Sequence, residues 1–216
     1  KMMPGEYILT AIPLNILNAI IITNILNPVK VPPKEDVVIT LGQADAAAQK
    51  EPFFSFLGDS ILGAGKLILI ITANVVAFVA LAGTIDNILR LIWPVLSLEN
   101  IFGVIMFPFA FLLGFEPHSA FNLAQLMGLK LVTNEFVVMG KVTDTITTYP
   151  AHFAAVLTVF LTSFANFSTV GMIIGAMKGI LPKEQNDIIS KHVLYMFYSG
   201  VFVSLMSAAI AGLFVW

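Results

Sequence analysis

The chain has 216 residues, of which 58% are hydrophobic and 11% are charged. A soluble domain usually has about 25% charged residues, so this composition predicts an integral membrane protein and excludes a water-soluble globule. The formal net charge of −2 provides no basic face for nucleic acid, and the absence of cysteine excludes disulfides and cysteine-based metal sites. Because the chain begins at Lys1 without a cleavable signal pattern, we expect it to be part of a longer protein.

Long uncharged stretches predict an all-α membrane fold. About 20 helical residues cross the hydrocarbon layer, and uncharged runs of about that length occur at 7–29, 67–85 and 193–216. A shorter run at 100–115 becomes a long, tilted span when 91–98 is added. We predict about five transmembrane helices, one re-entrant helical hairpin and an interfacial amphipathic helix. The expected boundaries are a span at 1–29, a loop and amphipathic helix at 30–66, two spans at 67–115, the hairpin at 116–142, an interrupted span at 145–180 and a last span at 191–216.

The connections between the spans are expected to be irregular or interfacial. Small, polar and aromatic residues mix between Gly42 and Leu57, which is typical of a helix that lies in the membrane interface. The glycines between 58 and 65 predict a joint after that helix, and Trp93-Pro94 predicts a bend. Residues 181–190 are expected to form a polar loop. The Lys and Arg counts on the two sides are close to equal, so they do not determine the orientation.

The segment 117–141 is too polar and too short to cross the membrane twice. It has apolar residues at 117–129 and 136–140, with a polar group between them that consists of Lys130, Thr133, Asn134 and Glu135. Two helices of about 12 residues each reach about 18 Å, roughly half of the bilayer. This pattern predicts a re-entrant hairpin with its polar tip near the middle of the membrane.

The segment 145–177 is too long for one span. It has no formal charge, and as a single straight helix it would extend about 50 Å, well past the membrane. Its middle, 162–169, is crowded with Ser, Thr and Asn, which compete for backbone hydrogen bonds and favour helix ends. We therefore expect a span that is interrupted near its centre.

Both interruptions would place free backbone ends near the middle of the membrane. Broken backbone is too costly in contact with lipid, so it must line a protein or water cavity, as it does at the substrate sites of secondary transporters. Glu135 is the main candidate site residue, because a carboxylate at that depth marks a functional site by default. The alternative is that Glu135 only complements a helix dipole. Asn166 is the second candidate, and its alternative role is an interhelical hydrogen bond.

Other kinds of chemistry have little support. The sequence contains no Gly-x-Ser-x-Gly, no His-Glu-x-x-His and no Gly-rich phosphate loop, so we predict no catalytic residue, no metal site and no enzyme activity. Three histidines, His118, His152 and His192, lack ligand spacing and are interpreted as interfacial residues. Lys130 lies five residues before Glu135, and a structural ion pair between them is one interpretation.

Two motifs resemble those of a known family. Residues 128–137, Gly-Leu-Lys-Leu-Val-Thr-Asn-Glu-Phe-Val, contain the Gly-x-Lys-x-x-x-Asn-Glu-Phe-Val run of the concentrative nucleoside transporters, which include the bacterial nucleoside permeases. Residues 163–171 are similar to that family's Phe-Ala-Asn-x-Ser-Ser stretch, and 181–188 resembles its loop before the last helix. The resemblance covers essentially the whole chain, as the C-terminal region of such a transporter.

This resemblance implies cation-coupled uptake of nucleosides by an elevator-type movement, in a homotrimer in the cell membrane. It implies that Glu135 and Asn166 bind ribose hydroxyls, with Phe164 and Thr169 nearby, and we add Asn134 to the candidate substrate-binding residues. Most members have Ser at the position of Thr169. The family's first hairpin, with its nucleobase contacts, and most of the site for the coupling ion, Na⁺ or H⁺, would precede residue 1. The region 43–57 and the last residue, Trp216, would face the outside.

The two main candidates suit a sugar, because a carboxylate accepts strongly from hydroxyls and an amide can both donate and accept. Two other interpretations stay open. A channel or gating module would share the broken helices and transport no solute. An intramembrane enzyme ranks below both, since the sequence shows no nucleophile or metal constellation.

Overall fold

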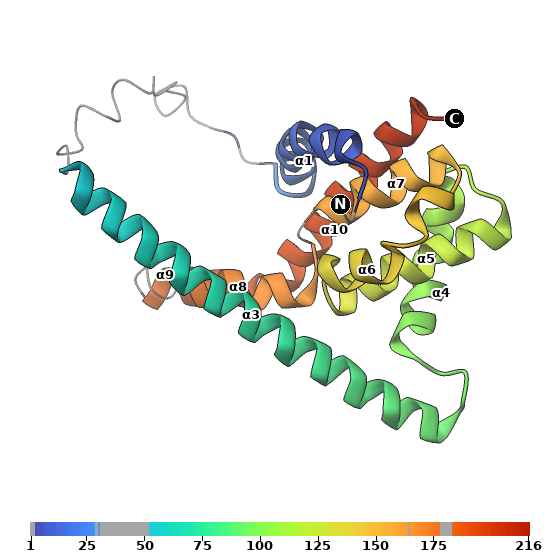
Figure 1. Cartoon of the computed structure of the whole chain (residues 1–216), viewed down its shortest axis with the longest axis horizontal. Coiled ribbons are helices and arrows are strands. Elements are labelled where there is room, and N and C mark those ends of the chain that lie inside the picture. Colours follow the sequence, from blue (N-terminus) through green and yellow to red (C-terminus); the bar gives the residue numbers. More distant parts are fainter. Residues whose placement is uncertain (1–2, 29, 31–51, 164, 178–182) are drawn as a thin grey trace.

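The structure is a computed structural model, and it describes residues 3–28, 30, 52–163, 165–177 and 183–216. Helices and short connections make up these residues, which confirms the predicted all-α fold. The first half contains α1 (Gly5–Leu26), α3 (Phe53–Ile92), α4 (Leu98–Leu112), α5 (Pro117–Val132) and α6 (Glu135–Val142). The second half contains a short 3₁₀ helix, η1 (Ile146–Thr148), and then α7 (Ala151–Thr162), α8 (Phe167–Met177), α9 (Lys183–Lys191) and α10 (Val193–Leu213) (Figure 1).

Several helices are long and apolar enough to cross a bilayer. Within the described residues they are Gly5–Leu26, Phe53–Ile92 and Val193–Leu213. The interrupted segment Ala151–Ile174, which contains α7 and the first part of α8, is also long and apolar enough. α4 is a shorter apolar helix of 15 residues. Large apolar side chains on α1 and α3, such as Leu9 and Leu69, are exposed on the surface of the protein. This is expected for helices whose surroundings in the membrane are lipid.

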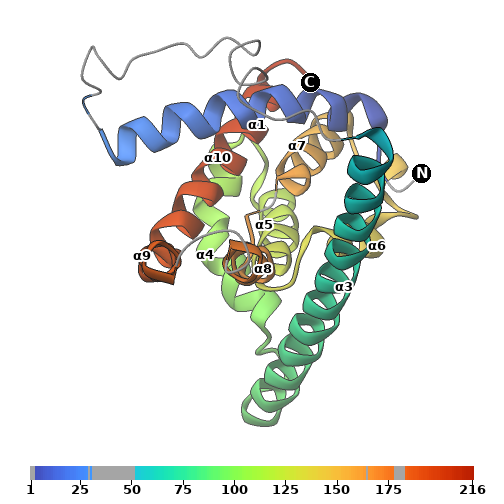
Figure 2. The ribbon, with the colours of Figure 1, turned by 90° about the vertical axis from the view of Figure 1, so that its left-hand side faces the viewer.

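α7 lies at the centre of the fold. Every residue from His152 to Leu161 is buried, which is the expected state of a helix that is apolar on all sides. α1, α5 and α10 pack around it, and Figure 2 shows α1 crossing the end of the group formed by α7 and α10. A buried hydrogen bond of 2.9 Å from Asn18 Nδ2 to Ser207 Oγ joins α1 to α10. The second helix break therefore comes immediately after the most deeply buried helix.

α4 and α5 pack closely, and a glycine makes this approach possible. A Cβ atom at Gly128 would lie 2.7 Å from Cβ of Phe102 and 2.9 Å from the backbone nitrogen of Gly103. Real Cβ atoms do not approach other atoms so closely, so a larger residue at Gly128 would push the two helices apart. This packing sets the position of α5, which leads into the candidate site.

The region between 52 and 92 differs from the prediction. Instead of a joint at 58–65 followed by a span at 67–85, one continuous helix of 40 residues, α3, runs through Gly58 and Gly65. Glycine lowers helix propensity by about 1 kcal/mol but leaves helical dihedrals accessible, and apolar surroundings favour the intrahelical hydrogen bonds. Of the expected interfacial helix at 43–57, only 52–57 lies within the described residues. These residues form the N-cap and the first turns of α3.

The third expected span is also shorter than predicted. Trp93 is extended, with φ of −150°, because the residue before a proline avoids the helical region, and α3 ends there as the predicted bend requires. Residues 91 and 92 therefore belong to α3, and the next helix begins only at Leu98. Ser97 Oγ accepts from the backbone N–H of Asn100, and Asp86 Oδ1 accepts from that of Leu98, so both acceptors satisfy free N–H groups at the beginning of α4.

Two further segments differ from the sequence expectations. The polar residues after 182 form the helix α9, in which Glu184 in the first turn and Lys191 in the last turn complement the helix dipole. At the other end, helix α7 begins at Ala151, after Pro150, and the preceding residues form turns and η1. The interrupted span is therefore shorter than the uncharged segment from which it was predicted.

His152 is buried inside the protein, in contrast to the expected interfacial position, whereas His118 and His192 are exposed. Its Nδ1 lies 2.7 Å from the carbonyl oxygen of Val215, and its Nε2 lies 3.1 Å from that of Leu113. The imidazole stacks on Trp216, with 4.2 Å between the ring centroids. These contacts place the C-terminus beside the turn that connects α4 to α5.

Candidate functional site

The first helix break lies between α5 and α6, at Thr133 and Asn134. Thr133 Oγ1 donates to the carbonyl oxygen of Leu129 at 2.6 Å, and Asn134 Oδ1 accepts from the backbone N–H of Val137 at 3.1 Å. Asn134 is therefore the N-cap of α6, as its residue type favours. Glu135 is the first residue of α6, where the helix dipole stabilises a negative charge.

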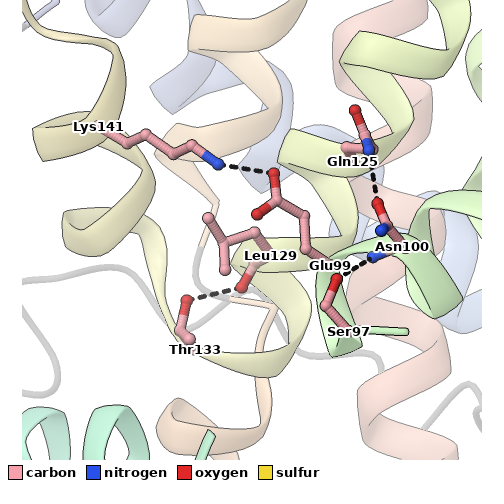
Figure 3. Close-up of polar contacts among 7 residues, drawn as sticks. All are labelled: Ser97, Glu99, Asn100, Gln125, Leu129, Thr133 and Lys141. Atoms are coloured by element: carbon pink, nitrogen blue, oxygen red, sulfur yellow. Dashed lines mark hydrogen bonds and ion pairs between the residues drawn. The ribbon is translucent and has the colours of Figure 1, made fainter. Parts of the chain in front are cut away.

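The chain reverses direction at this break, and two contacts show it (Figure 3). Lys141 Nζ lies 2.6 Å from Glu99 Oε1, and Gln125 Nε2 donates to Asn100 Oδ1 at 2.6 Å. Because Glu99 and Asn100 are neighbours, the end of α6 lies near the middle of α5. A continuous helix would separate residues 125 and 141 by about 24 Å along its axis. α5 and α6 therefore form a hairpin, with unequal helices of 16 and 8 residues instead of two helices of about 12.

We predict that this hairpin is re-entrant and that both of its ends lie on the face of the membrane where α10 ends. Glu116 and Tyr149 line one pocket together with Trp216, and α10 is long enough to place Asp187 on the opposite face. The chain has no cysteine of its own, so single cysteines at 116, 147, 187 and 214 can be labelled without background from these residues. We expect impermeant reagent to reach 116, 147 and 214 from one side and 187 from the other. Labelling of 116 and 147 from opposite sides would contradict a hairpin.

The second helix break lies between α7 and α8. Ser163, just after the end of α7, is extended, with ψ of 149°. Asn166 Oδ1 accepts from the backbone N–H of Thr169 at 2.7 Å, which makes Asn166 the N-terminal cap of α8. The interruption lies within the polar stretch 162–169 that predicted it. Phe164, one of the candidate residues, lies outside the described residues.

The two breaks meet at Glu135 and Asn166. Asn166 Nδ2 donates to Glu135 Oε2 at 2.7 Å, although the two residues are 31 positions apart. Both are buried, with exposed fractions of 0% for Asn166 and 5% for Glu135. The N-termini of α6 and α8 both lie at this contact, so two helix dipoles favour the carboxylate. The structure therefore brings together the two main candidate residues of the sequence.

Asn134 and Thr169 lie beside this pair in the sequence and are also buried. Asn134 Nδ2 has no hydrogen-bond partner within the part of the chain that the structure describes. An unpaired buried N–H costs about 1–3 kcal/mol, so this donor suits a polar ligand that enters the site. Thr169 lies in the first turn of α8, where its backbone N–H is used by the Asn166 cap.

Lys130 does not pair with Glu135 and has different partners. Its Nζ donates to the carbonyl oxygen of Phe160 at 3.1 Å and to Ser163 Oγ at 2.9 Å. Ser163 is thus a contact residue of the site region that the sequence analysis did not single out. The helix α5 ends at Val132, between Lys130 and Glu135, so spacing along a helix could not relate the two side chains. Helix C-termini attract cations, but Lys130 and Ser163 are 33 positions apart, so only the fold brings them together.

A larger cavity of about 560 Å³ lies on another side of the second break, between α1, α8 and α10. Its walls are mostly apolar and include Asn15, Ser163, Ala165 and Tyr195. Glu135 and Asn166 do not line it. The polar site at the two breaks is therefore separate from this cavity, and its chemistry rests on the buried carboxylate and amide.

Known proteins resemble the chain in both sequence and fold. Residues 7–212 match the family described as "Na+ dependent nucleoside transporter C-terminus". The chain is 47% identical over 216 residues to "Purine nucleoside transport protein NupG" of Bacillus subtilis (strain 168), an alignment that covers 100% of this chain and 53% of that protein. It is 30% identical over 168 residues to "Sodium/nucleoside cotransporter 1" of Mus musculus, covering 68% of this chain and 26% of that protein.

The fold agrees with these sequence matches. A solved structure of a CNTnw variant in the "intermediate 2 state" superposes with a TM-score of 0.79 at 21% identity, covering 98% of this chain and 51% of that one. The chain thus spans about half the length of NupG and of the CNTnw chain. The family match covers nearly all of the 216 residues, and the apolar helices are those of a multi-pass membrane protein. The chain therefore belongs to the Na⁺-dependent nucleoside transporter family and matches the C-terminal part of its members.

Proposed function

We propose that this chain is the C-terminal region of a secondary transporter that takes up nucleosides together with a cation, Na⁺ or H⁺, across the cell membrane. Glu135 and Asn166 bind the ribose hydroxyls in this proposal. The observation that carries it is the buried 2.7 Å hydrogen bond between Asn166 and Glu135, which joins two helix breaks. Relatives that are named as nucleoside transporters support the same function.

The donors and acceptors at the breaks suit a sugar with two neighbouring hydroxyls. An ionised carboxylate has acceptor capacity for several hydrogen bonds, and Asn166 uses only one of them. The amide of Asn166 has a second N–H, and Asn134 Nδ2 is a further buried donor. Thr169 and Phe164 complete the proposed substrate-binding set, the latter on the basis of the motif alone. The contacts to the nucleobase and most of the coupling-ion site are assigned to the part of the transporter that precedes this chain.

We assign no catalytic residue, no metal ion and no organic cofactor to this chain, and we do not propose that the chain is an enzyme. The proposed partners are the nucleoside, the lipid bilayer and further copies of the protein in a homotrimer, without nucleic acid. A channel that shares the broken helices is the second candidate, because helix breaks by themselves fit both. Saturable uptake that other nucleosides compete with distinguishes the transporter from the channel.

We expect nucleoside uptake by the full-length protein to depend on the ribose hydroxyls. The relative that is 47% identical is named a purine nucleoside transport protein, so the panel begins with inosine and guanosine and continues with uridine. A 2′,3′-dideoxy analogue leaves the buried Glu135 and Asn166 without hydroxyl partners, and it should compete with radiolabelled inosine about tenfold less well. The measurement is the concentration for half-inhibition, with and without Na⁺. Equal competition by inosine and by its 2′,3′-dideoxy analogue, or uptake that does not saturate, would contradict the proposed site.

A further inference from the structure

The ammonium group of Lys130 is completely buried next to the second helix break. The residue has an exposed fraction of 0%, and its Nζ contacts the carbonyl oxygen of Phe160 and the hydroxyl of Ser163. It also lies 4.5 Å from the centroid of the Phe160 ring, where a cation is attracted to the aromatic face. A buried lysine is expensive without partners, so these contacts account for its burial.

These partners belong to the end of α7. The last four carbonyl groups of a helix lack intrahelical donors and carry a partial negative charge, and Phe160 is one of them because the helix ends at Thr162. An ammonium group has three N–H donors, and Lys130 uses two of them to hold a helical carbonyl and the first residue after the helix. Lys130 therefore ties the end of α5 to the place where α7 stops.

Ser163 is held from a second direction as well. Its hydroxyl donates to the carbonyl oxygen of Phe160 at 2.9 Å. Its Oγ also contacts Oγ of Ser204 in α10, which lies 2.8 Å from the carbonyl oxygen of Gly200. Ser163 thus has contacts from α5 and α10 at once. Asn166 follows three residues later, so the path from the fixed Ser163 to the amide that contacts Glu135 is short.

We propose that Lys130 is a positioning residue for substrate binding, which holds the interrupted end of α7 through Phe160 and Ser163 so that Asn166 presents its amide to Glu135 and the ribose. This inference rests on the proposed function of the Glu135–Asn166 site. Lys130 links the two motifs of the site physically: it precedes the break that contains Glu135 and holds the break that contains Asn166. In this proposal Lys130 acts through the end of α7 and does not itself bind the ribose.

The test measures how well the transporter distinguishes inosine from 2′,3′-dideoxyinosine. In the full-length protein, Lys130→Met keeps the length of the side chain and removes the charge and the donors. We expect the half-inhibition concentration of 2′,3′-dideoxyinosine divided by that of inosine to fall about threefold from its wild-type value of about ten. A displaced Asn166 weakens hydroxyl contacts that only inosine makes, whereas Glu135 keeps its own. A purely structural role would lower the amount of folded protein or the maximal rate for both compounds and leave the ratio unchanged. Lys141→Met, on the exposed ion pair of the same hairpin, is the matched control and should keep the wild-type ratio.

Further variants distinguish the possible outcomes. If Lys130→Met is not recovered as folded protein, Ser163→Ala, which removes one acceptor of the ammonium, is read by the same ratio and should lower it in the same direction. In the double variant Lys130→Met with Asn166→Ala, the ratio should fall no further than in Asn166→Ala alone, since both act through one contact. A wild-type ratio in Lys130→Met overturns the inference, and so does a wild-type ratio in Ser163→Ala where that variant replaces it.

Glu135→Gln separates the two proposals. If Glu135→Gln also keeps the wild-type ratio, the proposed function fails. If Glu135→Gln lowers the ratio and Lys130→Met does not, only the role of Lys130 fails.

Discussion

Replacing Glu135 with Gln is expected to lower nucleoside uptake about 10- to 100-fold while the protein still folds. The new amide oxygen can accept from Asn166 Nδ2, which now lies 2.7 Å from Glu135 Oε2, so the contact between the two breaks persists. The substitution removes the charge and turns one acceptor into a donor. A hydrogen bond to a charged group contributes about 1.5–3 kcal/mol, which corresponds to the expected loss. Initial rates of radiolabelled inosine uptake, normalised to the amount of protein in the membrane, measure the effect.

Glu99→Gln is the matched control for this variant. It is the same substitution, in an ion pair with Lys141 whose side chains are 26% and 49% exposed. Exposed ion pairs contribute about 0–1 kcal/mol, and we expect uptake within about twofold of wild type. Uptake by Glu135→Gln at the level of the control would show that the carboxylate does not bind substrate, and it would favour the alternative in which Glu135 only complements the dipole of α6.

Replacing Asn166 with Ser is expected to abolish most uptake while the N-terminal cap of α8 is kept. Asn166 has two functions in the structure: its Oδ1 caps α8 at the N–H of Thr169, and its Nδ2 donates to Glu135. Serine is an equally good N-cap, so α8 keeps its first turn, but the shorter side chain does not reach the carboxylate. Asn166→Ala removes the cap as well and should cost about 1 kcal/mol of stability in addition. Uptake and thermal unfolding in detergent, measured on both variants, separate the two functions.

Asn24→Ser serves as the control for this pair. Asn24 is exposed on α1 and donates to the carbonyl oxygen of Ile20 in its own helix. Its replacement should leave uptake and the unfolding temperature unchanged. If Asn166→Ser transports like this control, the amide has no role in binding, and Asn166 serves only to cap α8 and to form the interhelical hydrogen bond that the sequence allowed as an alternative.

The local features of the site could be predicted from the sequence because they depend on neighbouring residues. Asn134 and Asn166 are capping residues, and each begins a helix within a segment rich in polar side chains, which is where the breaks were expected. The same local reasoning was wrong at 58–65, where glycines suggested a joint. Glycine weakens a helix without breaking it, and α3 continues through these positions because apolar surroundings favour a complete backbone hydrogen-bond ladder.

Charge content, apolar length and capping residues act over a few neighbouring positions, and they were enough to predict an all-helical membrane protein with two polar helix breaks. Which groups meet at those breaks depends on the fold. In the folded protein Asn166 donates to Glu135, and Lys130 donates to the end of α7 and not to Glu135. His152 lies between two carbonyl groups. These contacts join residues at least 30 positions apart, and they arise because the packing of α4, α5, α7 and α10 fixes where each break lies in space.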